Sequence, residues 1–118
     1  MNPSEPPSIL YVGSDPSLEY LLNRYAQRSG CRIQRVGGGA LDIDLTRPRP
    51  LSVWFSSLEV LADSPWLRAA AASLDIPLVV CAAVAGDARG HDLGADYIFL
   101  HPVTYDSFVS TLGTSPAP

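Results

Sequence analysis

The feature that most constrains the fold of this chain is a series of five short strand-like runs, most of them apolar, each separated from the next by a longer stretch. The runs lie at residues 9–13, 31–36, 51–55, 78–82 and 97–100. Short runs of this kind, bounded by turn-forming residues, are typical of buried strands. Helical segments between consecutive strands make βα units, and right-handed crossovers then give a parallel sheet covered on both faces. The pattern predicts a doubly wound α/β fold.

Helix signals fall between these runs. Asp15-Pro16 supplies an N-cap and a proline at the first helical position, and Ser29-Gly30 ends the segment that follows. Between them the apolar side chains recur every three or four residues, as on one helix face: Leu18, Leu21, Leu22, Tyr25 and Ala26. Ser64-Pro65 repeats the start signal for a helix that extends to Leu74.

The remaining helical segments are weaker. A short helix is expected around residues 87–93, and Thr104 is expected to cap a last helix that reaches about Leu112. Residues 37–50 contain three glycines and two prolines, which leave room for at most a short helix. Gly37-Gly38-Gly39 follows a strand but lacks the spacing of a phosphate-binding loop, so we interpret it as a turn.

Length and composition indicate one globular domain. The chain has 118 residues, of which 47% are hydrophobic and 17% are charged. We expect the domain at residues 8–112, with disordered tails or linker stubs at 1–7 and 113–118, which are rich in Pro, Ser and Thr.

Charge and hydropathy exclude several classes of protein. A net charge of −4 argues against nucleic-acid binding, which needs a concentrated basic face. No signal peptide is evident, and the apolar run at 76–85 is about half the length that a membrane span requires. Cys31 and Cys81 are expected on separate buried strands rather than in a secreted disulfide framework. The sequence does not decide whether these two cysteines form a disulfide with each other. The sequence predicts a cytoplasmic protein.

Three segments carry a resemblance to a known family. They are Ile9-Leu-Tyr-Val-Gly-Ser-Asp-Pro16, Ile76-Pro-Leu-Val-Val-Cys-Ala-Ala83 and Gly94-Ala-Asp-Tyr-Ile-Phe-Leu-His-Pro102. Together they resemble the receiver domain of bacterial response regulators, the CheY-like family, over about residues 8–112. The resemblance implies a flavodoxin-like five-stranded parallel sheet with strand order 2-1-3-4-5. It also implies a functional crevice at the carboxyl ends of the first and third strands.

The resemblance also implies where the family's phosphorylation chemistry is located. In the family, an acidic pair at the positions of Gly13 and Ser14 holds Mg²⁺, and an aspartate at the position of Ser56 accepts phosphate. A Thr or Ser at Ala82 and a Lys at His101 then contact that phosphate. This chain keeps none of the five, so the resemblance is to a degenerate receiver without catalytic residues, metal or cofactor. His101-Pro102 does keep the dipeptide whose peptide bond is cis in the family.

The polar residues left near the crevice have simpler interpretations. We expect Asp15 to cap a helix rather than to bind a metal. Ser56 is expected to fill the space of an aspartate, with modification by a separate kinase as an unsupported alternative. His101 is interpreted as a turn residue that caps the pocket, and with His91 it does not make a zinc site.

We therefore predict a non-phosphorylatable module that binds a protein partner in bacterial signal transduction, or forms a homodimer. In the family, the contact face comprises the fourth helix, fifth strand and fifth helix, here residues 87–93, 97–100 and 105–112. Tyr97, Ile98 and Tyr105 are the candidate interface residues, with Tyr105 partly exposed and Ile98 in place of the family's switching aromatic residue. The alternative is a sensor that binds a small ligand in the emptied crevice. An enzyme is the weakest option because no nucleophile–base pair is evident.

Overall fold

A computed structural model describes residues 7–36, 50–82, 92–100 and 103–111 of the chain. These residues form a five-stranded parallel sheet with strand order β2-β1-β3-β4-β5. The strands are β1 (Ser8–Val12), β2 (Arg32–Val36), β3 (Val53–Phe55), β4 (Leu78–Ala82) and β5 (Tyr97–Leu100). The predicted doubly wound sheet and its strand order are therefore confirmed.

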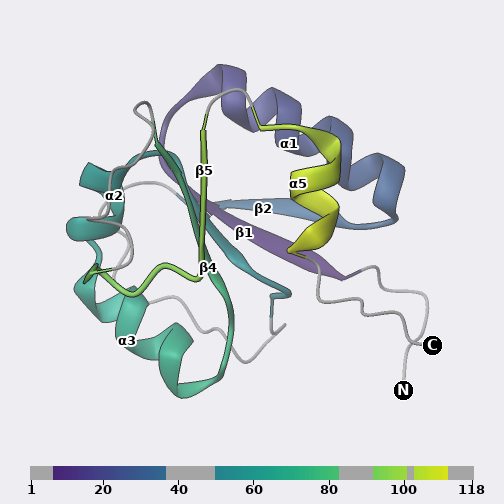
Figure 1. The fold of residues 1–118 in the computed structure, drawn as a ribbon. Coiled ribbons are helices and arrows are strands. Elements are labelled where there is room, and N and C mark those ends of the chain that lie inside the picture. Colours follow the sequence, from purple (N-terminus) through teal and green to yellow (C-terminus); the bar gives the residue numbers. More distant parts are fainter. Residues whose placement is uncertain (1–6, 37–49, 83–91, 101–102, 112–118) are drawn as a thin grey trace.

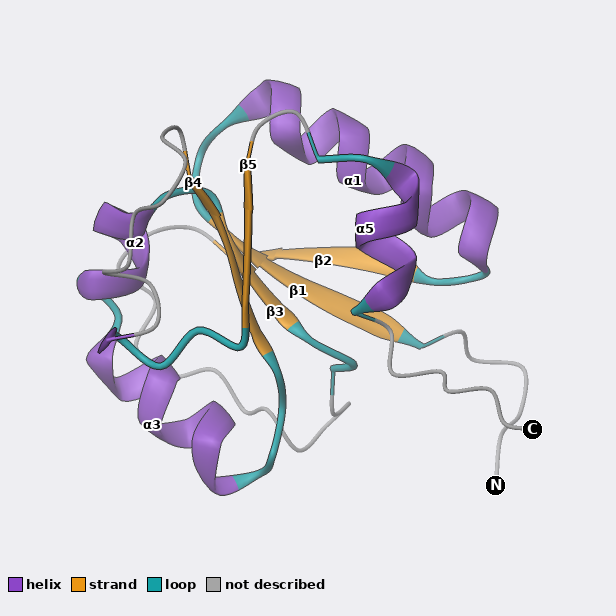
Figure 2. Cartoon of the chain, in the orientation of Figure 1, coloured by secondary structure: helices purple, strands orange, loops and turns teal. Residues whose placement is uncertain are grey.

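Helices cover both faces of the sheet (Figure 1). They are α1 (Pro16–Ser29), α2 (Leu58–Ala62), α3 (Pro65–Ser73) and α5 (Tyr105–Ser110). Figure 2 shows α1 and α5 together on one face and α2 and α3 on the other. The two edge strands are β2 and β5.

Alternation along the strands divides the core into two layers of different character. Beneath α2 and α3 the core is mainly aliphatic, and it contains Leu10, Val53, Leu61, Leu67 and Val80. Beneath α1 and α5 it is rich in aromatic residues, with Tyr11, Trp54 and Phe108 fully buried. The central parallel strands have continuously apolar sequences because they are buried on both faces.

Local signals account for the helix ends. The Asp15 side chain accepts hydrogen bonds at the N-terminus of α1, and Gly30, in the left-handed conformation, ends it. Thr104 caps α5 through Ser107 N. Ser64 precedes α3 as predicted, but its hydroxyl donates to the Val60 carbonyl oxygen instead of capping α3.

Several predicted boundaries were wrong. β1 begins at Ser8 and ends at Val12, because Gly13 leaves the strand with a φ of 144°. β3 spans Val53–Phe55 and not 51–55, and Cys31 precedes β2 although it is buried as predicted. The five-residue helix α2 was missed, since it is too short to show a helical period. The two short helices considered at 37–50 and around 87–93 lie mostly outside the described residues, and so does Leu112.

Candidate functional site

The crevice predicted from the resemblance lies where β1 and β3 end, and Gly13 and Ser56 meet there. Ser56 N donates a 3.1 Å hydrogen bond to the Val12 carbonyl oxygen, so the two strand ends stay paired up to this point. Gly13 is buried and has a φ of 144°, which side chains rarely permit. A Cβ atom at Gly13 would collide with Ser56 Oγ and would lie 2.6 Å from Ser56 Cβ. The serine side chain therefore takes the space that a side chain at position 13 needs.

Tyr11 lies under the turn that follows β1. Its ring is fully buried, and its hydroxyl donates to the Asp15 carbonyl oxygen at 3.2 Å and accepts from Asp15 N at 3.0 Å. Burial raises the pKa of the Tyr11 phenol above 10.0, and hydrogen bonds to the Asp15 backbone and the Ser56 side chain only partly offset this effect. The phenol therefore stays neutral near pH 7 and braces the turn. Sequence reasoning missed this role, although strand alternation already placed Tyr11 on the same face as Ile9.

The carboxylate of Asp15, beside this turn in the described part of the chain, is engaged. Asp15 Oδ1 accepts from Ser17 N at 3.1 Å and from Leu18 N at 3.2 Å, which confirms the predicted capping role. Ser14 is exposed and offers only a hydroxyl group. Among the described residues, no group of three or more His, Cys, Asp or Glu side chains is placed to hold a metal ion.

The other predicted pocket residues belong to β4 and the segment after β5. Ala82 ends β4, where its backbone pairs with Leu100, and its side chain lies outside what the structure describes. His101 and Pro102, including the predicted cis bond, also lie outside the described residues. All eight basic residues of the chain are arginines, so no lysine is available anywhere to replace the one that the family uses.

The groups gathered at the crevice have limited chemistry. Gly13 contributes only backbone, Ser14 and Ser56 contribute hydroxyl groups, and Tyr11 contributes a phenol. An acyl phosphate needs a carboxylate acceptor, and Mg²⁺ in such sites is held by one or two carboxylates together with phosphate oxygens. The described groups provide neither an acceptor carboxylate nor a free metal ligand.

The candidate interface residues divide between the two faces of the sheet. Tyr97 packs with the aromatic layer and Ile98 packs with the aliphatic one, as strand alternation predicted. Leu100, at the end of β5, is 47% exposed. The edge strand β5 therefore presents apolar side chains at its carboxyl end.

Tyr105 is half-buried and tied to α1. Its ring centroid lies 5.4 Å from that of Tyr25 and 4.0 Å from the Arg28 guanidinium carbon. Its hydroxyl oxygen lies 3.1 Å from Ser29 Oγ. These contacts give Tyr105 a structural role that its place in the first turn of α5 did not reveal.

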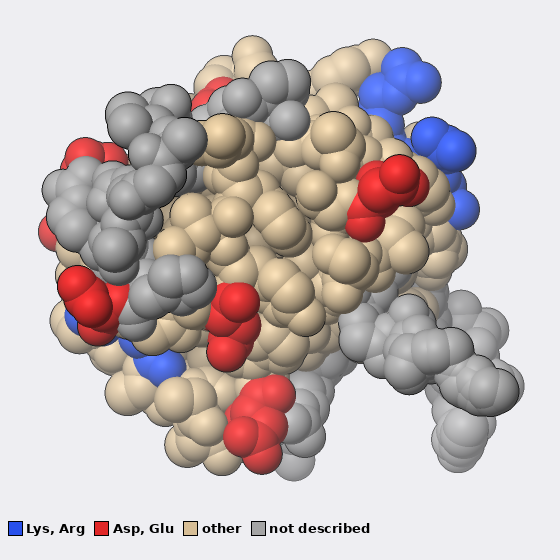
Figure 3. Space-filling model, in the orientation of Figure 1, with Lys and Arg blue, Asp and Glu red and all other residues tan. Residues whose placement is uncertain are grey.

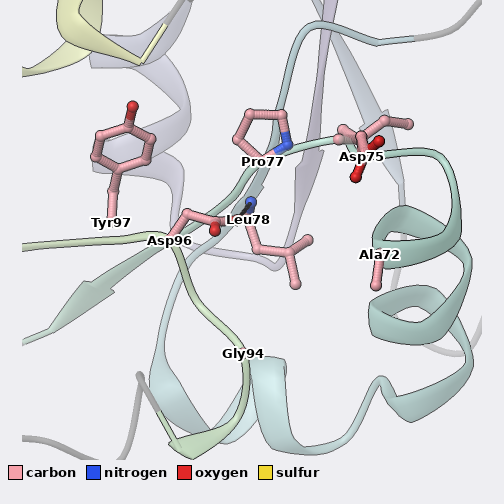
Figure 4. A pocket seen from close by; sticks show the side chains of 8 residues that line it. Ala72, Asp75, Pro77, Leu78, Gly94, Asp96 and Tyr97 are labelled. Carbon is pink, nitrogen blue, oxygen red and sulfur yellow. Dashed lines mark hydrogen bonds between the residues drawn. The ribbon is translucent and has the colours of Figure 1, made fainter.

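A hollow of about 390 Å³ lies at the opposite end of the sheet from the crevice. Figure 4 shows Asp75 and Asp96 on either side of the segment that leads into β4, with Tyr97 nearby. Asp96 Oδ2 accepts a 2.8 Å hydrogen bond from Leu78 N, so this carboxylate secures the start of β4 against the start of β5. We interpret it as a structural group.

Within the ranges that the structure describes, no helix is long and apolar enough to cross a bilayer.

Comparison with known proteins places the fold among receiver domains. The chain resembles the chemotaxis protein CheY4 of Vibrio cholerae, with 14% identity and a TM-score of 0.70, over 90% of this chain and 95% of that one. A response regulator receiver protein of Burkholderia phymatum gives 16% identity and a TM-score of 0.69, over 91% and 95%. A response regulator protein of Burkholderia multivorans gives 21% identity and a TM-score of 0.66, over 96% and 98%.

These likenesses are in structure rather than in sequence. No protein-family model matches the chain, and no curated protein matches it. The chain has the CheY-like receiver fold, which the strand order and the three similar structures establish.

Proposed function

We propose that this chain is a receiver-like domain that is not phosphorylated and that binds a protein partner in bacterial signal transduction. The observation that carries this proposal is the contact between Gly13 and Ser56. At the position where the family has a metal-binding carboxylate, the backbone adopts a glycine conformation and a neighbouring side chain fills the space. The acidic residues are thus missing from a turn whose backbone conformation favours glycine.

This glycine turn supports loss of function more strongly than the missing carboxylates alone would. If only the side chains had changed, restoring three aspartates would restore a metal site. At Gly13 an aspartate would meet Ser56 and a φ of 144° together. Burying a carboxylate near the Tyr11 phenol without a cation would also carry a desolvation cost. We therefore propose that the domain is not phosphorylated by the route that receivers normally use.

A constitutive binding surface is the second part of the proposal. The Tyr25 hydroxyl donates a 2.8 Å hydrogen bond to the Val103 carbonyl oxygen, and Tyr105 packs between Tyr25 and Arg28. These contacts fasten the segment before α5, and α5 itself, onto α1. They favour a single arrangement of β5 and α5, which suits a surface whose binding does not depend on a trigger.

The surface itself is proposed to be β5 with α5. Leu100 and Ile98 lie on the aliphatic side of β5, Tyr97 lies on the aromatic side, and Tyr105 lies at the start of α5. An edge strand with exposed apolar residues can pair with or pack against a partner. A signalling or output protein in the cytoplasm, or a second copy of the chain, is the proposed occupant.

The test is the response to Mg²⁺ with beryllofluoride or acetyl phosphate. Amide spectra of the wild-type domain should not change, whereas a phosphorylatable receiver in the same buffers should shift strongly. Saturable shifts at Gly13 and Ser56 at millimolar Mg²⁺ would contradict the proposal. A small-ligand sensor, the alternative left open by the sequence, predicts instead that a nucleotide or metabolite panel produces saturable shifts around the same residues.

A further inference from the structure

Charge is distributed unevenly over the described part of the molecule. The helix α1 and the strand β2 carry four arginines: Arg24, Arg28, Arg32 and Arg35. Of the described carboxylates on this face, Asp15 caps α1 and Glu19 lies 3.5 Å from Arg35, while Asp106 at the start of α5 is exposed. The far side has one arginine, Arg68, among five carboxylates: Glu59, Asp63, Asp75, Asp92 and Asp96. Figure 3 shows most of the basic atoms near α1 and most of the acidic ones towards α2 and α3.

An aromatic side chain projects from the basic side. Tyr20 on α1 is 62% exposed, which is unusual for so large a side chain. The Arg24 guanidinium carbon lies 5.8 Å from the centroid of its ring, and Arg24 Nη1 donates a 3.1 Å hydrogen bond to its hydroxyl oxygen. This pair, which we call the Tyr20 knob, presents an apolar ring with a positive charge beside it. Tyr and Arg are the residue types most enriched at the centres of interfaces.

An apolar groove lies on the acidic side. It has a volume of about 320 Å³ and is lined by Leu58, Glu59, Ala62, Asp92 and Leu93. Three of these residues are apolar, and the exposed Glu59 and Asp92 are both negative. We call it the α2 groove. It would receive an aromatic ring and a guanidinium group better than it would receive an anion.

The knob and the groove cannot meet within one molecule. Leu18 and Leu22 of α1 pack into the aromatic layer, whereas Leu58 and Leu61 of α2 pack into the aliphatic layer on the opposite face of the sheet. Two copies can bring them together. Because the two surfaces differ, such a contact is heterologous: the copy that gives its knob keeps a free groove, the other keeps a free knob, and further copies can add at either end.

We propose that this chain associates head to tail, with the Tyr20 knob of one copy in the α2 groove of the next. The Tyr20 ring lies against Leu58, Ala62 and Leu93, and the Arg24 guanidinium lies near Glu59 and Asp92. Ring burial supplies most of the attraction, while the charges set orientation and make it sensitive to salt. The surface is distinct from β5 and α5, so this inference does not rest on the proposed function.

The experiment uses two complementary variants of the full chain. The knob variant is Tyr20→Ser with Arg24→Glu, and the groove variant is Glu59→Arg with Asp92→Arg. All four residues are exposed or half-buried surface residues outside the core, and circular dichroism checks that each variant is folded. Sedimentation velocity in low salt should show concentration-dependent association of the wild type, and molar salt should weaken it. Each variant alone should associate at least about tenfold more weakly.

Mixing the two variants gives the decisive result. The knob variant keeps an intact groove and the groove variant keeps an intact knob, so the mixture should form a one-to-one complex that does not grow further. Arg32→Glu, a charge change on β2 outside the knob, is the matched control and should associate like the wild type. The proposal is overturned if the wild type remains monomeric at millimolar concentration in low salt, or if the mixed variants remain monomeric. Association lost in Leu100→Ser but kept in both variants would assign self-association to β5 instead.

Discussion

The Tyr25 hydroxyl donates a 2.8 Å hydrogen bond to the carbonyl oxygen of Val103, joining the middle of α1 to the residue that leads into the α5 cap. The rings of Tyr25, Tyr105 and Phe108 pack around this bond, with centroid separations from 5.4 to 6.5 Å. Hydrogen bond and rings together fix the C-terminal helix to the N-terminal one. The proposal of a constitutive surface depends on this attachment.

Removal of the Tyr25 hydroxyl should weaken the attachment without disturbing the rings. Tyr25→Phe leaves the Val103 carbonyl oxygen without this donor, so we expect the free energy of unfolding to fall by about 1 kcal/mol. Urea denaturation measures the change. Tyr20→Phe is the matched control, because the Tyr20 hydroxyl lies on an exposed residue, and it should alter stability by no more than a few tenths of a kcal/mol. Equal effects of the two changes would contradict the role given to Tyr25.

Truncation of Tyr105 should destabilise the domain rather than affect binding alone. Tyr105→Ala removes the ring contacts to Tyr25 and Arg28, and for a half-buried aromatic residue we expect a loss of about 2 kcal/mol. The sequence alone predicted that Tyr105 is a partly exposed interface residue, and its contacts with α1 add this structural role. Tyr105→Phe keeps the ring and should cost well under half as much. Thermal unfolding that is unaltered in Tyr105→Ala would show that the contacts with α1 are dispensable.

Substitution of Gly13 tests whether the crevice is filled. Gly13→Ala adds both backbone strain at a φ of 144° and overlap with Ser56, so stability should fall by about 3 kcal/mol. Gly94→Ala is the control, because Gly94 has a φ of 95° with no atom within 4 Å of its Cβ position. Gly94→Ala therefore adds backbone strain without a collision, and it should lower the stability by less than Gly13→Ala does. The double variant Gly13→Ala/Ser56→Gly should recover part of the loss, and strict additivity would mean that the two residues do not collide.

Replacement of Asp75 should stabilise the domain. Asp75 follows α3 with a φ of 58°, and Ile76 N donates to the Ala71 carbonyl oxygen at 2.9 Å, which completes the helix end. A carboxylate here faces the negative end of the helix dipole. Asp75→Asn keeps a side chain that tolerates this conformation and removes the charge. The free energy of unfolding, measured from the shift in the denaturation midpoint, should therefore rise by about 0.5 kcal/mol. Asp75→Ala, which lacks that tolerance, should be less stable than Asp75→Asn.

The cysteines predict a loss of stability in alkaline solution. Burial, with a smaller contribution from Asp15, raises the pKa of the Cys81 thiol to about 12, and burial also raises that of Cys31. In the unfolded chain a thiol ionises near its ordinary value of 9.0. The unfolded state therefore releases its protons first, and stability, intact below pH 9, should fall as the pH rises from about 9 to 12.

Cys81→Ala is the variant that checks this pH dependence. It lowers stability at neutral pH because it leaves a small void, but its stability should depend less steeply on pH above 9 than that of the wild type. Tyr11 acts with the same sign above pH 10, because burial raises its pKa as well. Denaturant unfolding at several pH values measures the slopes. Parallel slopes for the two proteins would place the ionising group elsewhere.

The sequence by itself determined the elements whose causes are local. Capping by Asp15 and Thr104 and the stop at Gly30 depend on hydrogen bonds and backbone preferences within a few residues, so they could be predicted and are confirmed. The apolar runs fixed the strands and the parallel sheet, because central strands must be buried on both faces. The resemblance supplied the strand order and the position of the crevice.

Only the tertiary structure decided how distant residues meet. Nothing local in Gly13 or Ser56 reveals that one fills the space of the other, since the contact exists only once β1 and β3 lie side by side. Tyr105 is partly exposed, as the sequence predicted, but its contacts with Tyr25 and Arg28 exist only once α1 lies against α5. The helix α2 was too short for its period to be recognised, and packing of Leu58 and Leu61 in the aliphatic layer adds to its local Ser57 cap.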